Sequence, residues 1–228
     1  MKYNMEQSKS SYLMEDIEEY NIADDYTLKE FTQSMNNNDI TYLPNFLTEA
    51  ELLPFEKIIK EIRKNINLST LQNQSVGKIA LNDEDYKYIC HHTGRYDIWN
   101  IATTIKKPQI KLLENFKQKS IGCLLLDANT LTDGKYHKDT VKLFGEMPNS
   151  FLPPFYYNML VATCDQTELN GPTTFLLDDE LWWVKLKRGD ALIFDGEIIH
   201  RGIKNITNAN RDMIYAIFTK PWYDEEKL

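Results

Sequence analysis

The sequence predicts a mainly β fold, a jelly-roll barrel of the double-stranded β-helix type with flanking N-terminal α-helices. Two observations lead to this prediction. From about residue 121 onward the chain consists of short apolar or alternating segments separated by turn-forming sequences. Eight such segments fall within roughly 100 residues, which is typical of a jelly roll. The chain has 228 residues, a length at which an all-β barrel commonly forms one domain.

The N-terminal residues are polar and acidic, and we expect residues 1–24 to form an arm outside a single domain of residues 25–228. A packed first helix is the alternative, because Leu13, Ile17 and Tyr20 fall at near-helical spacing. No apolar core of a signal peptide is visible in this segment.

Two capping boxes predict helices before the barrel. Thr27–Glu30 opens a predicted helix that ends near Met35, and Thr48–Glu51 opens a second one that ends near Lys64. The second helix carries Pro54 close to its start, where proline can kink it or delay it. Between the two, residues 39–43 predict a short strand.

The third predicted helix covers Pro108–Lys119, with Ile110, Leu113 and Phe116 on one side. Residues 91–100 mix polar and aromatic residues around a glycine and predict a loop and a strand. The predicted barrel strands then follow in order: Gly122–Ala128, Lys135–Val141, Phe155–Asp165, Thr173–Leu177, Leu181–Lys187, Asp190–Gly196, Glu197–Ile203 and Arg211–Lys220.

Composition argues against several classes of protein. The formal net charge of −8 disfavours binding to nucleic acid, which requires neutralisation of phosphates. The three cysteines are widely spaced and form no CxxC motif, so we expect a reducing compartment, the cytoplasm. No window approaches 18 apolar residues, so no membrane association is expected. The sequence leaves the oligomeric state open.

A candidate metal site combines His137, Asp139 and His200. Residues i and i+2 of a strand share a face, so His137 and Asp139 are expected to point the same way. His200 ends another strand segment 63 positions later, and antiparallel barrels bring such distant strands together. Two histidines and one carboxylate leave three positions of a metal open, the arrangement of non-haem Fe(II) oxygenases. Taken singly, the HxD pair also fits two surface residues and His200 fits a buried, hydrogen-bonded histidine.

Arg211 enters an otherwise apolar strand, where a guanidinium needs an anionic partner. It matches a carboxylate through two parallel hydrogen bonds. A dicarboxylate could therefore chelate the metal at one end and meet Arg211 at the other. A salt-bridge residue is the plainer interpretation of Arg211 alone.

These residues resemble the Fe(II)/2-oxoglutarate-dependent dioxygenases, and more narrowly the phytanoyl-CoA dioxygenase-like group. The likeness covers residues 38–222 and rests on the order His137-x-Asp139, His200 and Arg211. The turn Asn170-Gly171-Pro172-Thr173, the segment Gly189–Phe194 before the distal histidine, and the opening segment YLPNFLTEAEL are similar to that group as well.

The resemblance implies a cupin-like oxygenase domain in which His137, Asp139 and His200 bind Fe(II) and form the catalytic centre. It also implies that 2-oxoglutarate pairs with Arg211, that dioxygen is consumed, and that succinate and CO2 are released. Relatives that transfer halogen replace the acid by a small residue, so the intact Asp139 implies hydroxylation. The exact outcome, whether hydroxylation, desaturation or cyclisation, stays open.

The chain departs from the group at Gly202, where relatives often carry a serine that helps to hold 2-oxoglutarate. The second contact must come from elsewhere, and Tyr157 and Tyr215 are the candidates. The segment Phe175–Glu180 also differs from the Pro-Gly-Ser-His sequence that follows the turn in many relatives.

The expected substrate is a small molecule, amino-acid-like or a natural product, because Arg95 could meet a carboxylate. Trp99 and Trp222 are further candidates for the substrate pocket, and packing roles are the alternative for all three. His91 and His92 are either additional ligands or solvated residues. The competing functions are a protein or peptide hydroxylase of the same chemistry, and a catalytically silent barrel that binds a metal or ligand.

Overall fold

The computed structural model describes residues 19–20, 29–31, 40–65, 76–80, 86–92, 95–100, 105, 107, 110–140, 143–144 and 151–223. For residues 19–20, 29–31, 76–80, 86–92 and 95–100 it describes the backbone path. The strands before the barrel are β1 (Glu19–Tyr20), β2 (Lys29–Phe31), β3 (Ile40–Leu43), β4 (Val76–Ala80), β5 (Tyr86–His92) and β6 (Arg95–Asn100). The barrel strands are β7 (Lys117–Leu126), β8 (Tyr136–His137), β9 (Tyr156–Ala162), β10 (Thr173–Leu177), β11 (Glu180–Val184), β12 (Ala191–Asp195), β13 (His200–Gly202) and β14 (Arg211–Thr219).

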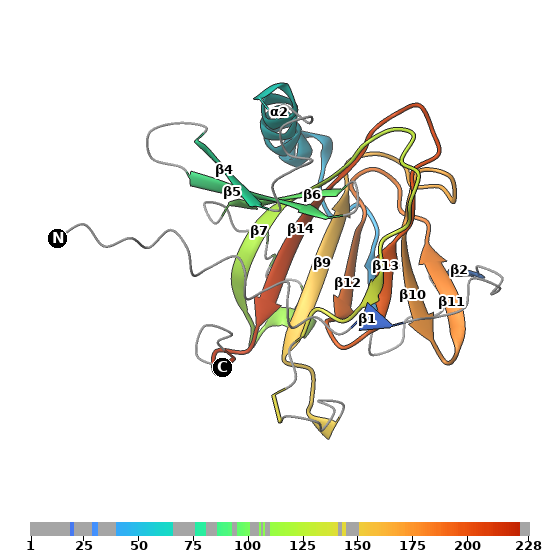
Figure 1. Ribbon diagram of the computed structural model, residues 1–228. Coiled ribbons are helices and arrows are strands. Elements are labelled where there is room, and N and C mark those ends of the chain that lie inside the picture. The colour runs from blue at the N-terminus through green and yellow to red at the C-terminus, as the bar shows by residue number, and fades with distance from the viewer. Residues whose placement is uncertain are drawn as a thin grey trace.

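Two sheets face each other in the molecule (Figure 1). The larger sheet has eight strands in the order β3-β12-β9-β14-β7-β6-β5-β4, and the smaller has six in the order β1-β8-β13-β10-β11-β2. Among the eight barrel strands, β7, β9, β12 and β14 lie in the larger sheet, and β8, β10, β11 and β13 lie in the smaller one. This confirms the predicted mainly β, antiparallel architecture and the predicted order of the barrel strands.

Alternation along the barrel strands divides the core into two layers. On β14, Met213 and Tyr215 belong to an inner cluster between the two sheets, together with Phe175 of the smaller sheet. Ile214 and Phe218 of the same strand belong to an outer cluster on the other face of the larger sheet. Both faces of the larger sheet are therefore apolar, and its strands are almost continuously hydrophobic.

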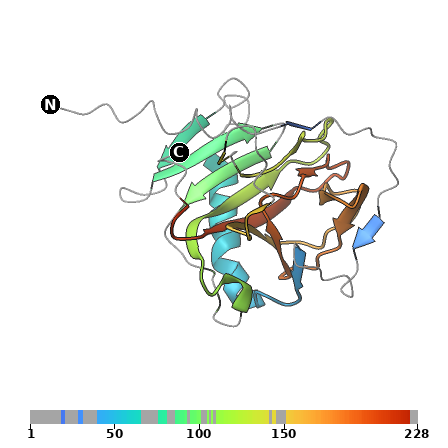
Figure 2. The same cartoon turned by 90° about the horizontal axis from the view of Figure 1, so that it is seen from below.

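Helix α2 (Glu49–Asn65) covers the outer face of the larger sheet, as Figures 1 and 2 show. Its start confirms the second capping box: the Thr48 N–H and hydroxyl donate to the Glu51 carboxylate at 2.8 and 2.9 Å. The hydrogen bond from the Thr48 N–H, followed by that from Lys107, lowers the pKa of Glu51 to about 2. Pro54 lies in the second turn of the helix, where its missing N–H removes the usual i→i−4 hydrogen bond to the Ala50 carbonyl.

A charged contact anchors the last turn of α2 to the sheet. The Arg63 guanidinium donates to both carboxylate oxygens of Asp212 on β14, and to Asp127 just after β7 at 2.7 Å. Asp212 points to the outer face, whereas its neighbours Arg211 and Met213 point inward. The same strand thus holds the helix with one face and contributes to the interior with the other.

Two of the three predicted helices are wrong. Residues 111–113 form a 3₁₀ turn and β7 begins at Lys117, so no α-helix spans Pro108–Lys119. The apolar set was nonetheless correct, since Ile110, Leu113 and Phe116 are all buried in the outer cluster. From Lys117 onward the residues pair with β14, and this pairing outweighs the helical spacing of the apolar residues.

The helix predicted from Thr27 to Met35 is also wrong where the structure describes it, because Lys29–Phe31 forms β2, parallel to β11. The other residues of that prediction lie outside the described part of the chain. Within the expected arm, Glu19–Tyr20 forms β1 against β8, and the rest of residues 1–24 lies outside the description. One α-helix is present among the described residues, and none there is long and apolar enough to cross a membrane.

Replacing Arg63 by methionine should lower the free energy of unfolding by about 1–3 kcal/mol, because two carboxylates lose a charge-assisted partner at a half-buried position. The midpoint of urea unfolding measures the change. Lys60→Met on the exposed side of the same helix is the matched control and should shift the midpoint little. Equal shifts in both variants would contradict the anchoring role of Arg63.

Candidate metal centre

Pairing of two short strands brings the two histidines together. His137 on β8 and His200 on β13 are directly opposite in the antiparallel register, and their ring centroids lie 4.5 Å apart. On the other side of β13, His200 is opposite Phe175. Phe194 of the larger sheet meets the His200 ring edge-on at 4.8 Å. The His200 side chain is therefore buried and held by aromatic rings on two sides.

Backbone carbonyls orient both imidazole rings in the same way. The Nδ1 atom of His137 lies 2.8 Å from the Lys135 carbonyl oxygen, and the Nδ1 atom of His200 lies 2.9 Å from that of Ile198. A carbonyl only accepts, so each Nδ1 carries the proton and donates it. In the neutral form of each ring, Nε2 then carries a lone pair, which is the state that binds a metal.

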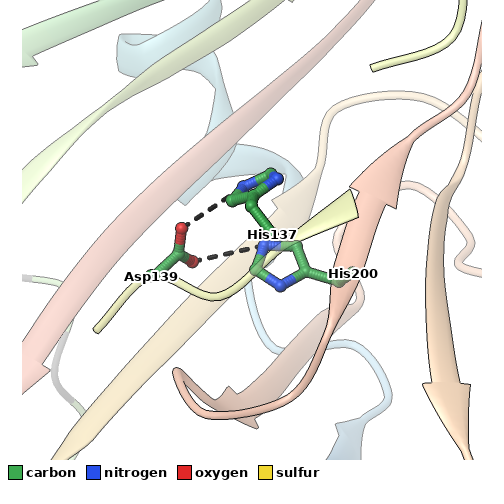
Figure 3. A group of neighbouring side chains, drawn as sticks. All are labelled: His137, Asp139 and His200. Atoms are coloured by element: carbon green, nitrogen blue, oxygen red, sulfur yellow. Dashed lines mark ion pairs between the residues drawn. The ribbon is translucent and has the colours of Figure 1, made fainter. Parts of the chain in front are cut away.

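Asp139 completes the group (Figure 3). Its Oδ1 lies 3.4 Å from Nε2 of His137, and its Oδ2 lies 3.2 Å from Nε2 of His200. Burial raises the pKa of the Asp139 carboxyl, but the imidazoles of His200 and His137, in their protonated form, outweigh that effect and hold the pKa well below its usual range. The carboxylate therefore stays ionised in the site.

One detail of the prediction is corrected here. The strand ends at His137, and Asp139 lies in the bend that follows, so the two residues do not share one strand. The Asp139 N–H donates to the Gly196 carbonyl at 2.9 Å, which fixes the bend against the turn after β12. This contact, and not strand alternation, aims the carboxylate at the histidines.

The donor atoms of the three residues lie within 4.8 Å of one another, so the group could hold a metal ion. Two imidazole nitrogens with available lone pairs and one ionised carboxylate suit a first-row divalent metal such as Fe(II). The residues present thus fit the metal that the sequence predicts.

Three further contacts support the Asp139 bend. The Asn158 amide on β9 donates to Asp139 Oδ2 at 2.6 Å. The Thr140 hydroxyl donates to Glu197, which lies three positions before His200. At Gly196, a Cβ atom would lie 2.6 Å from the Tyr156 ring and 3.0 Å from the Thr140 side chain of the bend, so a larger residue here would force these groups apart.

Arg211 is fully buried on the inner side of β14 and donates to the carbonyl oxygens of Asn170 and Gly171. These two residues begin the turn Asn170-Gly171-Pro172-Thr173. Gly171 has φ of +81°, and a Cβ atom there would lie 2.6 Å from the Ile203 carbonyl oxygen, which explains the glycine. Arg211 therefore lies on the inner face of β14, with its guanidinium against this turn.

The remaining predicted residues differ in position. Tyr215 lies in the inner cluster, on the same face of β14 as Arg211. Tyr157 lies in the outer cluster, with its ring centroid 4.9 Å from that of Phe116, so the structure does not bring it to the histidines. Alternation along β9 is the reason, because Asn158 takes the inward position. Trp222 is at the surface, 59% exposed, with its ring against Phe155.

For the predicted substrate residues of β6, the structure describes the backbone. Arg95 is opposite Leu126 of β7, and Trp99 is opposite Gly122. Residues 91 and 92 end strand β5 and residues 95–100 form β6, so the strand predicted within 91–100 is present. Residues 93 and 94, where the predicted loop surrounds the glycine, lie outside the described part of the chain. The side chains of His91 and His92 lie outside the described part of the structure.

Asn158, Thr140 and Glu197 are not among the site residues that the sequence predicts. A signal existed for Asn158, because it interrupts the apolar run of β9, and a buried amide needs a hydrogen-bond partner. Thr140 and Glu197 carry no such signal, since both are ordinary residues of turns.

No protein-family model matches the chain. One curated protein does, the "Fe(II)/2-oxoglutarate-dependent dioxygenase nvfF" of Aspergillus novofumigatus (strain IBT 16806). The two are 34% identical over 86 residues, a stretch that covers 32% of this chain and 28% of the relative.

Solved structures share the fold over most of the chain. AviO1 from Streptomyces viridochromogenes Tue57 superposes with a TM-score of 0.55 at 14% identity, covering 82% of this chain and 91% of AviO1. HygX from Streptomyces hygroscopicus, solved with nickel, 2-oxoglutarate and hygromycin B, gives a TM-score of 0.56 at 9% identity, with coverage of 82% and 85%. SnoK, a non-heme alpha ketoglutarate dependent carbocyclase from nogalamycin biosynthesis, superposes with a TM-score of 0.52 at 11% identity, covering 84% of this chain and 87% of SnoK. The chain thus has the jelly-roll fold of 2-oxoglutarate-dependent oxygenases.

Thr140→Val removes the hydroxyl that links the Asp139 bend to Glu197, and we expect metal affinity to fall by about 10-fold, the usual effect of losing a group that supports a metal ligand. Competition of Co(II) with a chromophoric chelator measures the affinity. Thr140→Ser keeps the hydroxyl and should bind like the wild type. Wild-type affinity in the valine variant would refute the link.

Proposed function

We propose that this chain is an Fe(II)- and 2-oxoglutarate-dependent oxygenase that hydroxylates a small molecule with release of succinate and CO2. The observation that carries the proposal is the convergence of His137, Asp139 and His200 on one point inside the barrel, with both Nε2 atoms and the carboxylate turned toward it. The sequence match to a curated Fe(II)/2-oxoglutarate-dependent dioxygenase supports it over 86 residues.

In this proposal the three residues would hold Fe(II), and the bound metal would supply the chemistry that activates dioxygen. The chain's own part is to bind and orient. The Lys135 and Ile198 carbonyls keep both imidazoles in the metal-binding tautomer. Phe175 and Phe194 shield His200 from water, so a reactive species in the site is kept from side reactions.

Arg211 is the proposed partner of the distal carboxylate of 2-oxoglutarate. The assignment is based on the position of Arg211, which is fully buried on the inner face of β14, and on the fit of a guanidinium to a carboxylate through two parallel hydrogen bonds. Tyr215 shares the inner face of β14 and is the proposed second contact, whereas the position of Tyr157 gives no support to that role.

The intact carboxylate of Asp139 favours hydroxylation over halogen transfer. A small-molecule substrate, amino-acid-like or a natural product, is part of the proposal, and the structural neighbour HygX with hygromycin B bound is consistent with it. Arg95, Trp99 and Trp222 remain the proposed substrate residues.

Anaerobic titration of the protein with Fe(II) and 2-oxoglutarate tests the proposal. We expect the weak visible charge-transfer band of a chelated 2-oxo acid to appear in the wild type, and no band in His137→Ala, because two remaining ligands hold the metal too weakly. A band of equal strength in both proteins would show that the metal binds elsewhere. If the band appears but no substrate in a library of amino acids and natural products causes succinate release, the protein is better described as a catalytically silent barrel that binds a metal or ligand.

Arg211→Met should weaken 2-oxoglutarate binding by about 10–100-fold, the effect of losing hydrogen bonds to a charged group, while Fe(II) binding persists. Titrating the band with 2-oxoglutarate at saturating Fe(II) measures the change. Because Arg211 also supports the turn at Gly171, thermal unfolding of each variant must be followed. Arg211→Lys keeps the charge and should bind better than the methionine variant. A stable methionine variant with wild-type affinity would exclude Arg211.

A further inference from the structure

The inner face of β9 contains one amide among apolar side chains. Tyr156, Leu160 and Ala162 alternate along this face and belong to the inner cluster, and Asn158 takes the position between the first two. Asn158 is 7% exposed and lies opposite Phe194 on one neighbouring strand and Ile217 on the other. A buried amide at such a position destabilises the fold unless it is hydrogen-bonded.

The partner of this amide is the candidate metal ligand Asp139. Nδ2 of Asn158 donates to Oδ2 at 2.6 Å, and this oxygen also lies 3.2 Å from Nε2 of His200. Oδ1 of the same carboxylate faces Nε2 of His137 at 3.4 Å. A carboxylate accepts and cannot donate, so the amide nitrogen, not the amide oxygen, must face it. The contact spans the interior, from the central part of the larger sheet to the bend after β8.

The hydrogen bond makes the two oxygens of Asp139 unequal. A carboxylate can bind a metal through one oxygen or through both. With one oxygen and two imidazoles, a six-coordinate metal keeps three positions open, enough for a chelating 2-oxo acid and for dioxygen. If both carboxylate oxygens bind, the metal keeps two open positions, and the 2-oxo acid alone would fill them.

We infer that Asn158 is a positioning residue that engages Oδ2 of Asp139 and so restricts this carboxylate to one metal-binding oxygen, which preserves the third open position. The inference rests on the proposed function, because it concerns the same three ligands. It assigns to Asn158 a role that a merely structural amide of the core would not have.

Manganese binding provides the test, since Mn(II) accepts the same ligands and relaxes the protons of each exchangeable water bound to it. Asn158→Leu removes the donor at similar volume. We expect the relaxation of water protons per bound Mn(II) to fall by about one third, because three open positions become two. Asn158→Gln retains a donor on a longer side chain and should restore part of the signal.

Met159→Leu is the matched control, because Met159 is the next residue of β9, points into the outer cluster and changes little in volume. It should leave the relaxation unchanged. A folded Asn158→Leu protein with wild-type relaxation per Mn(II) would overturn the inference. So would a folded variant that no longer binds Mn(II), since the amide would then hold the carboxylate in place without selecting an oxygen.

A measurement on the wild type decides the case if the Asn158 variants do not fold. In protein saturated with Zn(II), the side-chain amide protons of Asn158 should exchange with solvent far more slowly than those of the exposed Asn208. Equal exchange rates would mean that the hydrogen bond is lost when the metal binds, and would refute the inference. Failure of the proposed function looks different: His137→Ala would then bind Mn(II) as the wild type does.

Discussion

The pairing of β8 with β13 is the constraint on which the site depends. It is very short, yet it sets His137 opposite His200 and so decides the distance between the two imidazoles. The smaller sheet continues on the other side through β10, where Phe175 is opposite His200. A shift of one residue in this register would turn His200 to the other face of the sheet, so the site exists only in the register that the sheet imposes.

Strand β14 connects that site to the rest of the molecule. Its inward residues include Arg211 and Tyr215, and its outward residue Asp212 holds Arg63 of α2. Alternation therefore gives neighbouring residues of one strand separate tasks, one in the interior and one in the attachment of the helix. The same alternation on β9 separates Asn158, which faces Asp139, from Tyr157, which packs against Phe116 in the outer cluster.

The polar groups around the candidate metal site contact one another. Asp139 is the centre of this network, because it receives the Asn158 amide, faces both imidazoles and has its N–H bound to Gly196. The bend that contains it is fixed by backbone and side-chain contacts to the turn before His200. Ligands from distant parts of the sequence are thus joined to each other by hydrogen bonds that do not involve the metal, as expected of a preorganised site.

The sequence by itself determined the barrel strands, helix α2 and the identity of the three candidate ligands, because these follow from local patterns: apolar alternation, a capping box and the chemistry of His, Asp and Arg. It failed for residues 29–31 and 117–119, where pairing with β11 and β14 outweighs a local preference for helix. Only the tertiary structure decided that Asn158 faces the site and Tyr157 does not, and that Asp139 lies in a bend. These facts depend on register and on contacts between segments far apart in the chain, and no local pattern of residues encodes either.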